Sequence, residues 1–211
     1  MQTRFALFAL GPLIAASPLT GQARFGVVAG GVSATVSATN NTAFSVSSLT
    51  GLAAGISLRT RLAHNVSLAP EALFVMKGAK ETLIAAPTTT ATTRANYLEV
   101  PVLVRVMLGD GTMRPFLMGG PQASFKLSCQ TTVAGAGPGF DGTSDCNKST
   151  DNTSGITSTD VGLMIGAGIA GDRLSVSIRY DLGLVNIVRD QSAGAVTAKN
   201  RAFMAMVGIA L

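Results

Sequence analysis

The chain has 211 residues, of which 47% are hydrophobic and only 13% charged, so it is too apolar for an average soluble domain. It contains no apolar run of about 20 residues that could cross a bilayer as a helix. The basic residues behind the formal charge of +5 are scattered singly along the chain, which argues against a nucleic-acid partner. If the chain enters a membrane, a closed β-barrel remains, because lipid offers no hydrogen-bond partners to open backbone.

The N-terminus has the pattern of an export signal. Arg4 supplies a positive charge, an apolar segment follows over residues 5–16, and small and polar residues continue to Ala23. This pattern predicts a signal peptide over residues 1–23, with cleavage after Ala16 as an alternative. An N-terminal core helix is the other interpretation. The mature chain, residues 24–211, is then expected to be a single domain.

Beyond residue 24 the dominant period of hydrophobicity is two, which is typical of β-strands. In the segment 97–108, Leu98, Val102 and Val106 share one face, whereas Glu99 and Arg105 share the other. Eight such strands are expected, each long enough to cross a bilayer when tilted. They cover residues 25–38, 51–61, 66–78, 97–108, 114–127, 160–169, 174–184 and 203–211.

The predicted connections alternate in length. Residues 62–65, 109–112 and 171–173 are expected to be tight turns, and Asp110-Gly111 is a typical hairpin pair. Residues 39–50, 80–93, 128–158 and 189–199 are expected to be long polar loops. Short turns at one rim and long loops at the other are typical of transmembrane barrels. The predicted fold is therefore an all-β, eight-stranded, antiparallel up-and-down barrel, with short periplasmic turns and long extracellular loops.

The two-faced strands leave open which face points inward. An eight-stranded barrel has a narrow interior that side chains fill, so the aliphatic faces are expected to meet lipid and the glycines and charges to face the lumen. The alternative is a soluble barrel whose charged face is solvated. The predicted lumen charge network contains six cations and three anions: Arg59, Arg61, Glu71, Lys77, Glu99, Arg105, Lys126, Arg179 and Asp181.

Cys129 and Cys146 are the two cysteines of the chain. An even, local pair in an exported protein predicts a disulfide. A zinc site is not expected, because the one histidine, His64, is far away in sequence.

Three weaker patterns are interpreted as accidental. The segment 166–171 has the glycine spacing of a dinucleotide-binding loop, but a strand rather than a helix is expected after it. A catalytic His64 would need a nucleophile in contact with it, and it lies in a tight turn away from the rim of long loops. Residues 145–156 begin like a calcium loop, yet Thr150 and Ile156 occupy the positions that require Gly and Glu. We therefore expect no catalytic, cofactor-binding or metal-binding residues and no cofactor.

Several short stretches resemble the porin-like outer-membrane β-barrel family, the small PorT-type barrels with an OmpA-like fold. The matching stretches span the mature chain: residues 25–27, 68–71, 77–80, 97–101, 114–116, 119–121 and 179–184. The resemblance implies an exported barrel in the cell outer membrane and supplies no catalytic residues.

The expected function is a structural or interaction role through the extracellular loops, without catalysis. A narrow porin-like channel for small solutes and a lipid-modifying enzyme are the alternatives. The expected partners are outer-membrane lipid, the barrel assembly machinery and an extracellular ligand or protein bound by the loops.

Overall fold

The computed structural model describes residues 23–38, 44–83, 88–137, 139, 141–146, 157–186 and 198–211. The signal peptide expected over residues 1–23 lies outside this part of the chain except for Ala23. Within the described residues, no helix is long and apolar enough to span a membrane.

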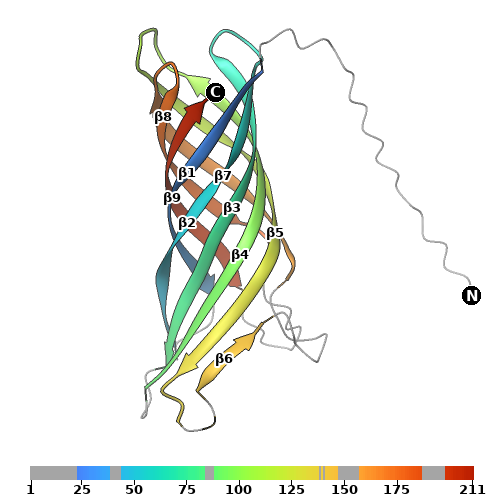
Figure 1. The fold of residues 1–211 in the computed structure, drawn as a ribbon, viewed down its shortest axis with the longest axis vertical. Coiled ribbons are helices and arrows are strands. Elements are labelled where there is room, and N and C mark those ends of the chain that lie inside the picture. Colours follow the sequence, from blue (N-terminus) through green and yellow to red (C-terminus); the bar gives the residue numbers. More distant parts are fainter. Residues whose placement is uncertain are drawn as a thin grey trace, which may run out of the picture.

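Eight long antiparallel strands form a closed ring, as predicted (Figure 1). Consecutive strands pair around the ring, and the last strand pairs with the first, from Gly26 with Ala210 to Ala38 with Ala198. A ninth, short strand, β6, pairs with β5 alone, outside the ring. The strands are β1 (Arg24–Ala38), β2 (Phe44–Arg61), β3 (Val66–Leu83), β4 (Thr89–Met107), β5 (Arg114–Ala134), β6 (Gly142–Asp145), β7 (Thr159–Ala170), β8 (Leu174–Gly183) and β9 (Ala198–Ala210).

The aliphatic face of most strands points out of the barrel, but on β1 Val28 and Val32 point inward and are buried. Along β4, Glu99, Leu103 and Arg105 are buried, whereas Leu98 and Val104, which are adjacent to them in sequence, are exposed. Leucine, isoleucine and valine are exposed in the same way on β7, β8 and β9. A soluble barrel would bury these side chains in its core, because water penalises a continuous apolar belt. The prediction that the aliphatic faces meet lipid is therefore consistent with the fold, and the solvated outer face of a soluble barrel is not.

The three predicted tight turns are present at one end of the barrel. They join β2 to β3, β4 to β5 and β7 to β8, and the start of β1 and the C-terminus lie at the same end (Figure 1). In the β4–β5 turn, Gly109 adopts the left-handed conformation, with φ of 70°. Glycine adopts this conformation more easily than residues with a Cβ do.

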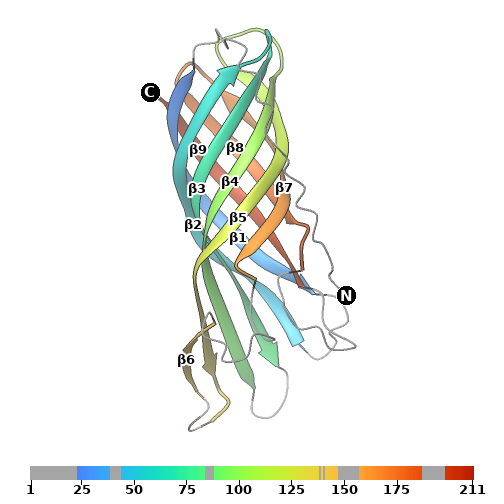
Figure 2. The same ribbon diagram turned by 90° about the vertical axis from the view of Figure 1, so that its right-hand side faces the viewer.

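At the opposite end, strands replace much of the predicted loop structure. Four segments that the sequence predicts to be loops are strands in the structure. They extend β2, β3, β4 and β5 well past the rest of the barrel (Figure 2), and they comprise residues 44–50, 80–83, 89–93 and 128–134. These segments are rich in Thr and Ser. Their polar side chains conceal the strand pattern, yet β-branched Thr suits a strand, and the backbone pairing continues through these residues. We call this part of the sheet, residues 44–50, 79–83, 89–95 and 128–134 together with β6, the projection.

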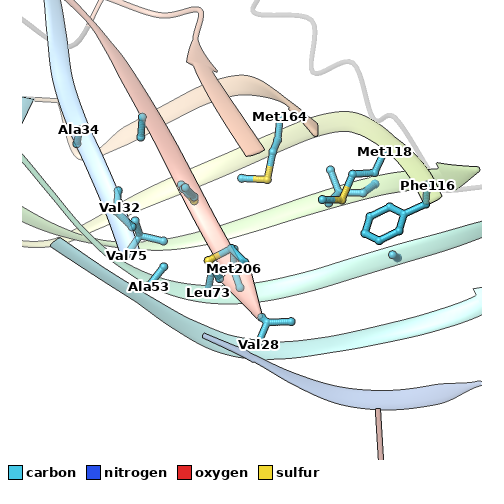
Figure 3. Close-up of a cluster of buried hydrophobic side chains, with 14 of the residues drawn as sticks. Val28, Val32, Ala34, Ala53, Leu73, Val75, Phe116, Met118, Met164 and Met206 are labelled. Carbon is cyan, nitrogen blue, oxygen red and sulfur yellow. The ribbon is translucent and has the colours of Figure 1, made fainter. Parts of the chain in front are cut away.

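An apolar cluster fills part of the lumen (Figure 3). Leu73, Leu103, Met164 and Met204 are fully buried inside the barrel. The expectation that small residues and charges fill the lumen is therefore incomplete. A single large apolar side chain on a largely polar inner face is hard to detect by periodicity, but close packing of a narrow interior requires such side chains.

Candidate functional site

The candidate site is the barrel interior, where charged side chains from different strands meet. At mid-height, Lys77 of β3 lies between Glu99 of β4 and Asp181 of β8. Its Nζ is 2.5 Å from Glu99 Oε1 and is also paired with an Asp181 carboxylate oxygen. Gln122 of β5 donates a hydrogen bond to Asp181. All these side chains are buried, so the lysine and the carboxylates stabilise each other where water does not.

A second ion pair joins β3 to β8 closer to the short turns. Arg179 Nη1 lies 2.5 Å from Glu71 Oε2, and Arg179 Nη2 lies 3.3 Å from Glu71 Oε1. Arg179 Nε also donates to the Ser177 hydroxyl at 3.2 Å. The two-point contact uses the planar fork of the guanidinium, a geometry that fixes orientation as well as charge.

Two further polar contacts extend the mid-height network. Asn200 Nδ2 donates to Asp160 Oδ2 at 3.0 Å, and both residues are buried. Lys77 Nζ lies 5.7 Å from the ring centroid of buried Tyr97. Asp160 and Asn200 were absent from the predicted network. Asp160 stood on the polar face of its predicted strand and could have been found there, whereas Asn200 falls before the predicted start of the last strand.

Among the described residues, Arg59, Arg61 and Arg105 of the predicted network form no ion pair with its acidic members. Arg105 is buried with its guanidinium 3.4 Å from the Phe116 ring centroid. Arg59 is half-buried, and Arg61 is exposed at the end of β2. Lys126 of β5 is half-buried. The structure therefore brings together Glu71 with Arg179 and Lys77 with Glu99 and Asp181, and it collects the unpaired arginines at the short-turn end of the lumen.

The structure places two of the weaker sequence patterns within a strand and a turn. Residues 166–170 lie inside β7, and another strand follows the turn after it, so the helix that a dinucleotide site needs is replaced by a strand. His64 is exposed in the β2–β3 turn. Among the described residues, no group of three or more His, Cys, Asp or Glu could hold a metal ion. Most of the calcium-like segment, residues 147–156, lies outside the described residues.

The two cysteines meet in the projection. Cys129 of β5 is buried against Ala95 and Tyr97, and its Cα lies 5.3 Å from that of Cys146, which follows β6. The structure joins their sulfurs, so the bond would fasten the end of β6 to β5.

We expect no free thiol to titrate in freshly purified, denatured protein without reductant. Replacing both cysteines with Ser should leave the urea midpoint of the barrel nearly unchanged, because the strand ladder holds the ring. The cross-link closes a loop with a sequence separation of 17, which is worth about 3 kcal/mol in the chain-entropy model. The double variant should lose this stabilisation in the β5–β6 hairpin rather than in the ring of strands. Limited proteolysis should then cut the β5–β6 hairpin faster. Two titrating thiols in the untreated protein would contradict the pairing.

Comparison with solved structures finds similar barrels. Neisserial surface protein A is 15% identical, with 88% of this chain and 96% of that chain covered and a TM-score of 0.44. Ail, the attachment invasion locus protein of Yersinia pestis, is 8% identical, with coverage of 89% and 98% and a TM-score of 0.44. The outer membrane protein OprG from Pseudomonas aeruginosa is 12% identical, with coverage of 92% and 98% and a TM-score of 0.49.

No curated protein matches the sequence. A family model, the outer membrane protein beta-barrel domain, matches residues 16–189. This match covers most of the chain and agrees with the closed ring of strands and its apolar outer face. The chain therefore belongs to the outer membrane protein beta-barrel family.

Proposed function

We propose that this protein is a plugged, non-catalytic outer-membrane barrel that works as a structural or interaction protein through its projection. In barrels of this class the short turns face the periplasm and the long connections face the outside. The projection is then extracellular. The proposal includes export by the signal peptide over residues 1–23, insertion by the barrel assembly machinery and a belt of outer-membrane lipid around the aliphatic faces.

The observation that carries the proposal is the filled lumen. Lys77 with Glu99 and Asp181, and Glu71 with Arg179, link β3 to β8 across the interior. Leu73, Leu103 and other apolar side chains are buried in the same interior. An eight-stranded ring has just enough interior for side chains, so this filling leaves little path for solutes. It favours a plug over the porin-like channel.

The projection supports the interaction role. It extends an ordered, polar sheet beyond the apolar belt, and its outer strand, β6, is exposed along its whole length. Thr93 and Thr131 share a hydrogen bond of 3.0 Å across β4 and β5 within it. Ordered polar surfaces lose little conformational entropy on binding, so this sheet is suited to contact a ligand or protein outside the cell.

Planar-bilayer recording tests the plug. Refolded wild-type protein should give no sustained conductance steps. A variant that replaces Lys77, Glu99 and Asp181 together with Ala should conduct, because it removes the central cluster while leaving the ring of strands intact. A variant with Lys80 and Glu81 of the projection replaced by Ala is the matched control and should stay silent. Sustained wild-type steps as large as those of the triple variant would reject the plug and favour the channel.

A further inference from the structure

Arginines from three strands converge at the short-turn mouth of the barrel. A cavity of about 600 Å³ opens there. Arg24 begins β1, Arg59 and Arg61 end β2, and Arg114 begins β5, and all four line this cavity. Asp172, in the β7–β8 turn, is the one acidic side chain among the described residues that line it. The sequence scatters these arginines over some 90 positions, and the barrel brings them to one rim.

Behind this mouth lies a smaller inner cavity of about 30 Å³, which shares Arg24 and Arg59 with the outer one. Arg105 lines it and is only 5% exposed, yet its Nε and Nη2 have no hydrogen-bond partner in the described part of the chain. The positive charges of Arg59, Arg179 and Arg114 repel Arg105, and Glu71, which attracts it, is already bound by Arg179. Buried polar groups are nearly always hydrogen-bonded, so two unpartnered nitrogens on a buried guanidinium indicate that a partner from outside the chain is missing.

The balance of charge points the same way. Six arginines and two carboxylates line the two cavities together. One of these carboxylates, Glu71, is already bound by Arg179. Like charges gathered in a partly enclosed space repel each other, and this arrangement persists at low cost only if an anion occupies it.

We propose that the short-turn mouth binds a phosphate group, with Arg59 and Arg114 as its main ligands and Arg105 closing the site from within. Guanidinium forks match phosphate oxygens in two-point contacts, and several arginines favour an anion with more than one oxygen over a halide. The outer cavity opens at the short-turn rim, where the group could come from inorganic phosphate or from a phospholipid headgroup. The site is separate from the projection, so it does not depend on the proposed function.

Isothermal titration with inorganic phosphate, on the whole refolded protein in a neutral detergent at low ionic strength, tests the site. We expect binding near one phosphate per barrel. The double variant Arg59→Gln/Arg114→Gln should bind at least about tenfold more weakly, because charge-assisted hydrogen bonds are lost. Arg94→Gln, an exposed arginine on β4 toward the other end, is the matched control and should bind like wild type.

Thermal unfolding separates a binding role from a structural one. Without phosphate, the double variant should melt no lower than wild type, since it removes repulsion rather than an ion pair. Phosphate should raise the melting temperature of wild type and of Arg94→Gln but not of the double variant. If the double variant fails to fold, Arg61→Gln, an exposed neighbour in the same cavity, carries the same comparison with a smaller expected loss.

A second titration identifies the source of the phosphate group. Soluble short-chain phosphatidylglycerol, added below its micellar concentration, replaces inorganic phosphate as the probe. Binding of inorganic phosphate that depends on Arg59 and Arg114 supports a solute site. Arginine-dependent binding of phosphatidylglycerol without binding of inorganic phosphate supports a headgroup site. If the double variant binds both probes with the same affinity as wild type, or if neither protein binds either probe, the proposal is wrong. This outcome is independent of what the bilayer recordings show about the plug.

Discussion

Replacing Lys77 with Met is expected to lower the free energy of unfolding by about 3–5 kcal/mol, the cost of breaking a buried ion pair by removing one partner. Met has a similar length, so packing changes little. The loss comes from leaving Glu99 and Asp181, both fully buried, without their shared cation. Urea midpoints, measured in one detergent and followed by the shift in electrophoretic mobility between folded and unfolded barrel, give the change.

Two comparisons sharpen this prediction. Lys80→Met makes the same chemical change at an exposed position of the projection and should be nearly silent. Glu99→Gln should cost clearly less than Lys77→Met, because Asp181 still neutralises the lysine. If all three variants unfold at the wild-type midpoint, water screens these charges and the lumen is an open channel rather than a plug.

Gly30→Ala is expected to destabilise the barrel by on the order of 3 kcal/mol, the upper part of the range for overpacking. A Cβ at Gly30 would lie 1.9 Å from the backbone oxygen of Ala205. These residues belong to β1 and β9, the two strands that close the ring. Because the clash is with backbone rather than with a side chain that could rotate, the seam itself must shift.

The neighbouring glycine supplies the control. A Cβ at Gly31 meets nothing within 4 Å, and the residue is exposed on the outer face. Gly31→Ala should therefore change the urea midpoint by no more than an ordinary surface substitution, about 0.5 kcal/mol in either direction. Equal losses for the two variants would mean that the strand disfavours any side chain here and that the close approach at the seam is unimportant.

The sequence predicts the ring of strands well because the membrane-crossing part obeys one simple rule. Lipid on one side and a narrow lumen on the other impose a strict alternation, which Leu98 to Leu108 shows clearly. Beyond the bilayer that constraint ends. Thr89 to Thr93 lack an apolar face and were assigned to a loop, although they pair with both neighbouring strands. Hydrogen bonding between strands, which periodicity does not register, decides their structure.

The candidate site was predicted in composition but not in pairing. The two-residue alternation of hydrophobic and polar side chains places Glu71, Lys77, Glu99 and Asp181 on inward faces. It carries no information about how far along the barrel axis each residue lies or which strands are neighbours in the ring. Which cation meets which anion depends on strand register and tilt. Arg105 illustrates the difference. It points inward as predicted, yet it lies against the Phe116 ring, and the nearby acid, Glu71, pairs with Arg179 instead.

The seam between β1 and β9 also determines the order in which the protein can assemble. All other pairs in the ring join strands that are neighbours in the order of the chain. In contrast, β1 and β9 are far apart in sequence, so Gly26 must pair with Ala210. Bringing ends about 180 positions apart together, instead of about 10, costs about 2.5 kcal/mol more in loop entropy, at roughly 0.6 kcal/mol per doubling. Local hairpins can therefore form first, and ring closure is the late, slow event. Until then β1 keeps an open edge able to pair with other chains, so a protein truncated before β9 should aggregate rather than form a smaller barrel.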